Sequence, residues 1–418
     1  MQWFQGLCFP VALATLPMLP GDGLGLFRPF SRLLWAYAIT LGVLHLRLLL
    51  MGRLPADMVN TERIVYFKMI FALLLLYYAS CLVRSHDSAR RLLRSILLGA
   101  LITAGWILLC YLSGIGGAHY EADGVTATAG SDGVSGKAVA GFLLPAAAGA
   151  MYFGLREGSC RWALGAALLL AAVFVTFDRS AQVALLAGVS WMVIWWVGLA
   201  RPRPHSRAVI PFLLVIGVLG SMYFVHHGWE ELTARWTRDF DRGEIGSGRG
   251  AFYATAWSWY WEDSSTAEFL LGMGFGNIYD LMYTGSGIYR HTHSDLFDML
   301  LIGGIVGLAL YFFLFYVIAS LVKGLPVGSA EFAAAGALLL SFGVMSLLTG
   351  LMAFPHTVYA FGAQCICIRV LALQEESYPV PLNSDALCGG GLYHVLPREC
   401  CGREELVIPD WERTGRLW

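Results

Sequence analysis

Apolar runs of about 20 residues, separated by short polar segments, recur along most of the chain. A helix needs about 20 mostly apolar residues to cross the hydrocarbon core of a bilayer. By that criterion, candidate spans lie near 3–20, 31–51, 64–83, 92–112, 138–155, 161–177, 181–199, 208–226, 296–322, 331–353 and 355–373. The pattern predicts an all-α, polytopic integral membrane protein with about eleven (10–12) transmembrane helices.

The spacing of these runs divides the chain into four parts. Residues 1–226 hold the first membrane helices, about eight spans, although prolines interrupt the run at 3–20. Residues 227–295 form the longest segment between spans, residues 296–373 hold the last three spans, and residues 374–418 form a polar tail. Within the long segment, 249–261 (RGAFYATAWSWYW) predicts a helix whose aromatic side chains lie in the headgroup layer.

Composition excludes an ordinary soluble protein and gives no indication of a nucleic-acid partner. Apolar residues make up 57% of the chain, charged residues only 14%, and mean hydropathy is +0.62. A soluble domain carries about a quarter charged residues. A net charge of −1 offers no basic surface for nucleic acid.

The distribution of basic residues predicts orientation, because short cytoplasmic loops are enriched in Lys and Arg. One alternating set of connections is rich in arginine, and we expect it to be cytoplasmic together with the tail from Gln374. The opposite set holds fewer basic residues, so 113–137 and 227–292 are expected to be periplasmic. The cytoplasmic set comprises Arg28, Arg32, Arg84, Arg90, Arg91, Arg94, Arg156, Arg161, Arg201, Arg203, Arg207 and Lys323.

The stretch TFDRSAQ, Thr176 to Gln182, places Asp178 and Arg179 between two apolar runs with almost no loop. An arginine at the bilayer centre costs about 3 kcal/mol on insertion scales, so its position needs a reason. One reading is a helix-end anchor in which Arg179 snorkels and pairs with Asp178. The other is an anion site, because a guanidinium can grip phosphate through two parallel hydrogen bonds.

Two glycine-rich stretches lie in the predicted periplasmic segment. GSGRG, Gly246 to Gly250, could bring Arg249 and a helix N-terminus to an anion, or could be a flexible turn with a solvated arginine. LLGMGFGNI, Leu270 to Ile278, superficially resembles a nucleotide fingerprint, but no βαβ pattern surrounds it.

Histidines gather where the long segment meets the ninth apolar run, in YRHTHSD. A metal site built from His291, His293 and Asp295 is conceivable, but no further ligand set is apparent. A general base is the better functional reading, because the ordinary pKa of histidine lies near the working pH. Asp239 and Asp241 match a short DxD pattern used by many glycosyltransferases, and we interpret them as solvated loop. The sequence therefore predicts neither a metal site nor a cofactor.

Taken in order, three stretches resemble the O-antigen ligase and polymerase superfamily of bacterial envelopes. HSDLFDMLLIGGIVGL is similar to the family pattern of a histidine, a small polar residue and an apolar helix interrupted by glycines near Gly303 and Gly307. SGRGAFYATAWSW followed by LLGMGFGNI looks like the family's arginine, tryptophan and glycine-rich loop. TFDRSAQVALLAGV looks like its helix-end motif, with Asp178 where a small residue such as serine is common. The resemblance covers roughly 170–320.

The resemblance implies transfer of an undecaprenyl-diphosphate-linked oligosaccharide to an acceptor hydroxyl at the periplasmic face of the inner membrane. The acceptor would be lipid A-core, another lipid-linked glycan or a protein. The resemblance also implies that Arg179 and Arg249 bind the diphosphate and that His293 acts on the acceptor. Arg290, His291 and Trp257 follow as further substrate-binding candidates.

A polytopic transporter or exporter of a lipid-linked or small substrate is the alternative. A transporter should place ionisable residues near the middle of the membrane and often shows repeated halves. Here the predicted spans are nearly free of charge and the polar residues crowd one outer face, which favours surface chemistry.

Overall fold

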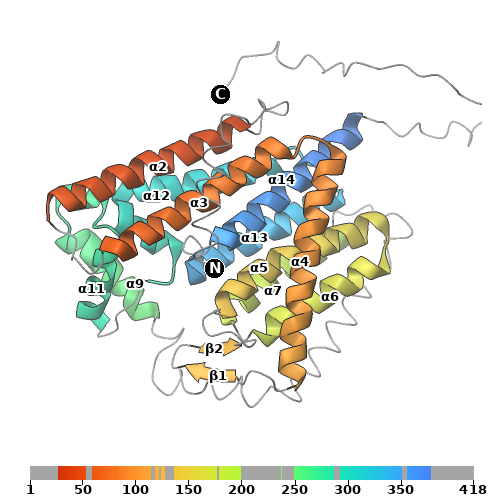
Figure 1. The fold of residues 1–418 in the computed structure, drawn as a ribbon, viewed down its shortest axis with the longest axis horizontal. Coiled ribbons are helices and arrows are strands. Elements are labelled where there is room, and N and C mark those ends of the chain that lie inside the picture. Colours follow the sequence, from red (N-terminus) through yellow and green to blue (C-terminus); the bar gives the residue numbers. More distant parts are fainter. Residues whose placement is uncertain are drawn as a thin grey trace, which may run out of the picture. The chain divides into compact units, whose positions relative to one another are not determined.

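The computed structural model describes residues 27–52, 59–113, 118–121, 124–127, 136–176, 178–198, 237, 249–286, 292–350 and 355–377. Within these ranges the chain is almost entirely helical (Figure 1). The elements are α2 (Phe27–Leu50), α3 (Val59–Leu82), α4 (His86–Ser113), β1 (Ala118–Glu121), β2 (Gly124–Ala127), α5 (Gly136–Glu157), α6 (Cys160–Val175), α7 (Arg179–Gly198), α9 (Arg249–Ser258), the π-helix η3 (Trp259–Asp263), α10 (Thr266–Leu271), α11 (Phe275–Ser286), α12 (Asp295–Val322), α13 (Ala330–Thr349) and α14 (Pro355–Ser377).

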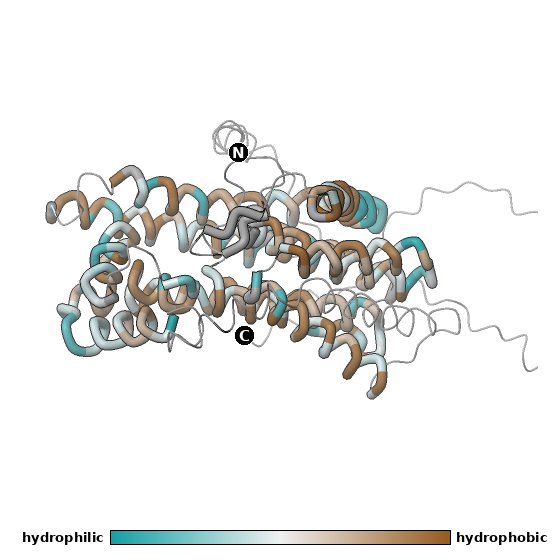
Figure 2. The backbone as a smooth tube through the Cα atoms, turned by 90° about the horizontal axis from the view of Figure 1, so that it is seen from below, coloured by the Kyte–Doolittle hydropathy of each residue, from teal (hydrophilic) through white to brown (hydrophobic). Residues whose placement is uncertain are grey.

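Seven helices in the described ranges are long and apolar enough to cross a membrane. They are Arg28–Leu50, Thr61–Leu82, His86–Cys110, Val139–Glu157, Ser180–Gly198, Asp295–Val322 and Ala330–Thr349. Cys160–Val175 and Thr357–Leu373 are shorter apolar helices. All of these segments coincide with predicted runs, whereas the runs at 3–20 and 208–226 lie outside the described residues. The total of about eleven spans stays a prediction. Hydrophobic residues follow the greater part of the long helices, and hydrophilic ones concentrate toward their ends (Figure 2).

The helices confirm the expected all-α fold, and one short antiparallel hairpin is added to them. β1 pairs with β2, and Ala118 lies opposite Ala127. The hairpin falls in the connection 113–137, where Tyr120, Val125 and Thr126 favour extended backbone. The apolar-run criterion misses it because the segment is polar and brief.

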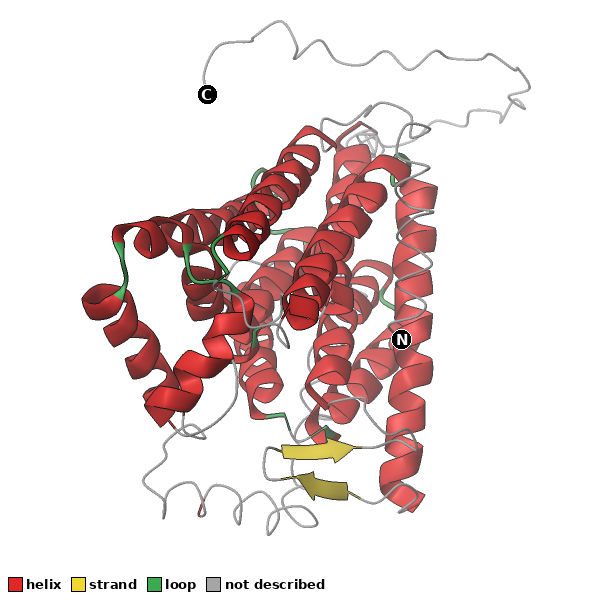
Figure 3. Cartoon of the chain, turned by 60° about the vertical axis from the view of Figure 1, so that its left-hand side comes forward, coloured by secondary structure: helices red, strands yellow, loops and turns green. Residues whose placement is uncertain are grey.

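The long helices lie side by side in a bundle (Figure 3). Helix α13 packs against α7 and runs antiparallel to it, as the hydrogen bonds at its two ends show. Near one end, the indole nitrogen of Trp195 donates to the carbonyl of Val327, at 2.8 Å. Near the other, Ser180 Oγ donates to the carbonyl of Leu348, at 3.2 Å. The 20 residues of α13 span about 30 Å. We call the end at Ser180 and Leu348 the site end, and the end where α13 begins the opposite end.

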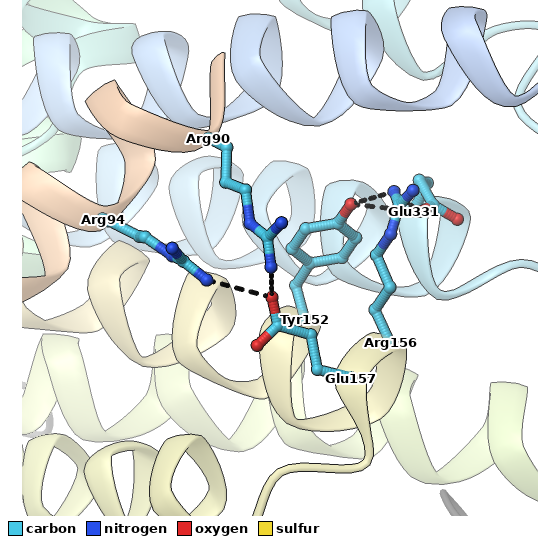
Figure 4. Close-up of polar contacts among 6 residues, drawn as sticks. All are labelled: Arg90, Arg94, Tyr152, Arg156, Glu157 and Glu331. Atoms are coloured by element: carbon cyan, nitrogen blue, oxygen red, sulfur yellow. Dashed lines mark hydrogen bonds and ion pairs between the residues drawn. The ribbon is translucent and has the colours of Figure 1, made fainter. Parts of the chain in front are cut away.

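The opposite end is held by a cluster of arginines and glutamates (Figure 4). Arg156 on α5 pairs with Glu331 on α13 at 2.7 Å, and the hydroxyl of Tyr152 bonds to both side chains. Arg90 and Arg94 on α4 both form salt bridges with the carboxylate of Glu157. Arg90, Arg94 and Arg156 all belong to the set predicted to be cytoplasmic, and the structure brings them together.

Helix α12 breaks at Gly304, which has φ 60° and ψ −148°. This conformation is open to glycine and strained for other residues. The break frees the carbonyls of Leu301 and Ile302, which accept hydrogen bonds from the backbone nitrogens of Met273 and Gly274 at 2.7 and 3.2 Å. The stretch LLGMGFGNI therefore packs into the break in α12, and a side chain on Gly304 would overlap the backbone of residues 269–270.

Two glutamates are buried in the first turns of α3 and α13, next to or at the start of the predicted spans 64–83 and 331–353. Glu62, on α3, accepts a hydrogen bond from the backbone nitrogen of Gly276 in the first turn of α11. A carboxylate is favourable there because a helix N-terminus is electropositive. Glu331 is likewise buried but faces Arg156. Each acid is tolerated because its partner lies on another helix, which the linear pattern does not reveal.

Candidate functional site

Three helices begin at the site end, and a fourth ends there. The first residues of α7, α9 and α12 lie around the C-terminal residues of α13, as the contacts below establish. The unpaired N–H groups of a helix N-terminus attract negative charge, and the unpaired carbonyls of a C-terminus need donors. The site end therefore joins electropositive helix starts to a set of carbonyl acceptors.

The start of α7 is fixed by Asp178. Its Oδ1 accepts a hydrogen bond from the backbone nitrogen of Ser180, at 2.9 Å, which is the usual arrangement of an N-cap aspartate. The side chain is buried, and Oδ2 has no hydrogen-bond partner among the described residues. Arg179 is the first residue of α7, which places its backbone at the site end. Its side chain lies outside the described part of the structure.

Arg249 joins the start of α9 to the start of α7. Its guanidinium donates to Ser180 Oγ at 3.2 Å, and the same hydroxyl donates to the carbonyl of Leu348. Arg249 is half-buried and is itself the first residue of α9. The Ser180 hydroxyl thus links α7 to Arg249, which lies 69 positions further along the chain. It also supplies a hydrogen-bond donor to the Leu348 carbonyl, near the C-terminal end of α13.

Tyr253, one turn after Arg249, packs α9 against α12. Its ring stacks on Phe297 with centroids 4.8 Å apart, and its hydroxyl donates to the carbonyl of Leu347 at 3.4 Å. Burial raises the pKa of Tyr253, while the nearby Arg249 lowers this pKa and Asp298 raises it. Because the net shift is upward from about 10, Tyr253 remains a neutral hydroxyl donor at physiological pH.

His293 lies in a tight loop immediately before α12, and its backbone is left-handed, with φ 60°. Asp298 fixes this loop, because its Oδ1 accepts from both the backbone nitrogen and the hydroxyl of Thr292, at 3.0 and 2.6 Å. The imidazole lies 6.4 Å, centroid to centroid, from the ring of Phe252 on α9. Because Arg249 and Phe252 are three residues apart on one helix, they share a face, and His293 lies beside that face.

Asp295, the first residue of α12, connects α12 to α13. Its Oδ2 accepts a hydrogen bond from Ser346 Oγ at 2.5 Å, and that hydroxyl also bonds to Tyr311, at 3.1 Å. All three side chains are buried. Asp295 therefore points to the neighbouring helix and links α12 to α13.

The structure brings together some predicted site residues and leaves others undescribed. Arg249, His293 and the backbone of Arg179 gather at the site end. Arg290 and His291 lie outside the described residues, as do Asp239 and Asp241. Trp257 is 56% exposed on α9, and its ring lies 5.6 Å from that of Trp261.

Sequence reasoning missed several residues that position the site. Ser180 and Tyr253 had a usable signal, because each follows a singled-out arginine within one helical turn. Ser346 and Thr292 had none, since a serine in an apolar run and a threonine in a loop are commonplace. Among the described residues, no group of three or more His, Cys, Asp or Glu side chains could hold a metal ion.

Residues 164–312 match the family model described as O-Antigen ligase. No curated protein matches the chain. The matched region begins in α6 and ends within α12, so it includes Arg179, Arg249 and His293. The match confirms the resemblance found in the sequence. Together with the apolar helices, it indicates a multi-pass membrane enzyme of glycan transfer.

Proposed function

We propose, on the premise of this family match, that the protein transfers a glycan from undecaprenyl diphosphate to an acceptor hydroxyl at the periplasmic face of the bacterial inner membrane. The hydrogen bond from Arg249 to Ser180 carries the proposal. It joins two helix N-termini, each beginning with an arginine, in the region that matches the O-antigen ligase family.

The diphosphate would bind to Arg179 and Arg249. A guanidinium presents paired donors that match phosphate oxygens, and the starts of α7 and α9 add the positive ends of two helix dipoles. The negative charge on the diphosphate grows as the glycosidic bond breaks. Fixed positive groups therefore stabilise the transition state more than the ground state, which is the condition for catalysis.

The acceptor hydroxyl would be activated by His293. The oxygen attacks the anomeric carbon, the bond from that carbon to the diphosphate oxygen breaks, and its electron pair leaves with undecaprenyl diphosphate. The hydroxyl proton passes to the imidazole. His293 suits this role because its loop is held by Asp298 and lies beside the α9 face that begins at Arg249. Trp257, Arg290 and His291 are further candidates for contacts with the glycan or acceptor.

The donor would be an undecaprenyl-diphosphate-linked oligosaccharide. The acceptor would be lipid A-core, a second lipid-linked glycan or a protein hydroxyl. Deleting the gene and separating the surface polysaccharide on a gel distinguishes these products. Loss of long chains on the core with accumulation of free polymer indicates a ligase, and single repeats on the core indicate a polymerase.

The direct test is transfer by the purified protein in nanodiscs, with a lipid-linked glycan as donor and a hydroxyl acceptor. We expect undecaprenyl diphosphate and glycosylated acceptor to appear in equal amounts, and we expect the reaction to persist in excess EDTA. Sealed vesicles that accumulate the intact donor without cleaving it would show a transporter instead. Loss of transfer in EDTA with recovery on adding a divalent ion would overturn the arginine-based account.

The proposed sidedness follows from the distribution of basic residues, which predicts that the tail from Gln374 and the opposite end of the bundle are cytoplasmic. Alkaline phosphatase fused at about Ser247 should be active, and the same reporter fused after Glu376 should be inactive. The reverse result would place the site end in the cytoplasm, where the proposed periplasmic reaction cannot occur.

A further inference from the structure

A cavity of about 350 Å³ lies next to the C-terminal end of α9, the end opposite Arg249. Its walls come from the end of α2, from η3, from α10 and from α11. The polar and aromatic groups among its lining residues are Arg47, Trp259, Glu268, Asn277, Asp280 and Thr284. We propose that this cavity binds sugar residues of a glycan taking part in transfer, an inference that rests on the proposed function.

Three of the wall side chains, those of Arg47, Asn277 and Glu268, are held by hydrogen bonds within the protein. Arg47 donates to the carbonyl of Gly272 at 3.1 Å, and Asn277 donates to the carbonyl of Met273 at 2.6 Å. Glu268 forms a capping box with Ser265 at the start of α10. A guanidinium has five N–H donors, so Arg47 can donate to a ligand as well as to the carbonyl of Gly272. Preorganised polar groups of this kind fix orientation in a binding pocket.

The charge in the cavity selects against a phosphate. Glu268 and Asp280 contribute two negative charges and Arg47 one positive charge, so these lining groups carry a net charge of −1. The two carboxylates of Glu268 and Asp280 would repel the negative charge of a phosphate. A neutral ligand with many hydroxyls fits, because it can donate to the carboxylates, bond to Asn277 and lay an apolar face on Trp259. The cavity volume is within the usual range for small ligands.

The position of the cavity fits a glycan extending from the proposed diphosphate site. Helix α9 begins at Arg249 and ends after 10 residues, immediately before Trp259. At 1.5 Å per residue it spans about 15 Å, and it packs against α11, which forms a wall of the cavity. Cationic groups thus mark one end of α9, and acidic and aromatic groups the other.

The test measures binding of two probes to the full-length protein in nanodiscs. One probe is the repeat-unit oligosaccharide cleaved from the cell's own surface polysaccharide, free of lipid and phosphate. The other is undecaprenyl diphosphate without sugar. Asp280→Ala should weaken oligosaccharide binding about 10- to 100-fold, as expected for losing hydrogen bonds to a charged group, and should leave lipid diphosphate binding unchanged.

Asp263→Ala is the matched control, because Asp263 is an exposed carboxylate on η3 that does not line the cavity. It should leave oligosaccharide binding unchanged. Trp259→Leu should also weaken binding of the oligosaccharide, and Trp259→Phe should restore most of it, since the aromatic face is kept. Equal oligosaccharide affinity in the wild type, Asp280→Ala and Trp259→Leu would overturn the proposal, as would an equal loss in Asp263→Ala.

The source of the sugar follows from steady-state transfer by Asp280→Ala. A raised KM for the donor assigns the cavity to the donor glycan, and a raised KM for the acceptor assigns it to the acceptor glycan. If the wild type transfers the glycan and the cavity variants bind the oligosaccharide normally, the cavity proposal is wrong and the proposed function stands. If the cavity variants lose oligosaccharide binding but the wild type transfers no glycan, the cavity binds sugar and the proposed function is wrong.

Discussion

The two ends of the helical bundle both carry arginines, but they use them differently. At the opposite end, Arg156 and Glu331 are 17% and 6% exposed and form an ion pair on neighbouring helices (Figure 4). At the site end, Arg249 donates to the hydroxyl of Ser180 and stands at the start of a helix. A carboxylate offsets the charge of the guanidinium that it contacts, whereas the Ser180 hydroxyl holds the Arg249 guanidinium beside the start of α7.

This difference indicates that the site end, rather than the opposite end, favours the binding of an anionic ligand. At the site end, Arg179 and Arg249 are the first residues of α7 and α9, where a helix N-terminus favours an anion. At the opposite end, Glu157 and Glu331 already supply negative charge to the arginines. We infer that the opposite end fastens α4, α5 and α13 together and that the site end binds the lipid diphosphate.

The largest effect is expected from removing the proposed base. His293→Asn should lower the transfer rate about 10²- to 10⁴-fold, the range for positioned proton transfer. Asparagine is the informative replacement because it tolerates the left-handed backbone that His293 adopts. Donor binding should change little, and both quantities are measured with a lipid-linked donor at matched protein concentration.

His293→Gly serves as the conformational control, since glycine adopts φ 60° without strain. It should be as inactive as His293→Asn if the imidazole performs the chemistry. A His293→Asn enzyme that keeps most of its activity would show that residue 293 only shapes the loop, and His291 would then be the next residue to test.

Arg249→Ala should reduce transfer about 10²- to 10³-fold, the loss typical of removing one donor to a developing negative charge. Arg249→Lys should recover part of that loss, because lysine keeps the charge but not the paired donors. The control is Arg94→Ala at the opposite end, where a part-exposed pair with Glu157 at 3.3 Å contributes about 0–1 kcal/mol. The transfer rate of Arg94→Ala should be close to wild type. Equal losses of transfer in Arg94→Ala and Arg249→Ala would contradict the different roles given to the two ends.

Glu331→Ala should act on stability rather than on chemistry. It leaves the largely buried guanidinium of Arg156, which is 17% exposed, without its carboxylate, and breaking such a pair costs about 3–5 kcal/mol. The melting temperature in detergent should fall, while the transfer rate per folded molecule stays near wild type. Glu157→Ala is the matched variant, because Glu157 is 25% exposed and its loss should cost less. Normal melting with abolished transfer would place Glu331 in the reaction instead.

The sequence predicted the helices well because a bilayer imposes a length and a composition on each span. Nine described helical segments, seven long and two short, coincide with predicted runs. The predicted helix at 249–261 is also confirmed as α9 continued by η3, although the change to π-helix could not be foreseen. A local pattern suffices where each helix satisfies its own backbone hydrogen bonds.

The linear pattern of apolar residues could not predict which residues contact one another across different helices. The break at Gly304 depends on the backbone of residues 269–274 filling it, and a glycine in an apolar run can equally serve close helix packing. Glu62 and Glu331 were missed for the same reason, since their partners lie 214 and 175 residues away. The sequence did single out Arg249 and His293, but it could not show that Ser180, Tyr253 and Asp298 hold the elements that carry them.

The smallest effect is expected at Tyr253, which positions α9 without taking part in proton transfer. Tyr253→Phe removes the neutral hydrogen bond of 3.4 Å to Leu347 and keeps the stacking on Phe297. A neutral bond contributes about 0.5–1.5 kcal/mol, so the transfer rate should fall less than about tenfold. Because burial raises the pKa of Tyr253, its hydroxyl stays protonated well above neutral pH and cannot serve as a base there. The pH profiles of wild type and Tyr253→Phe should therefore superimpose below about pH 9, where an unshifted tyrosine would still be largely protonated. A loss above 100-fold, or a changed alkaline limb, would move Tyr253 from positioning into the chemistry and weaken the assignment of His293 as the base.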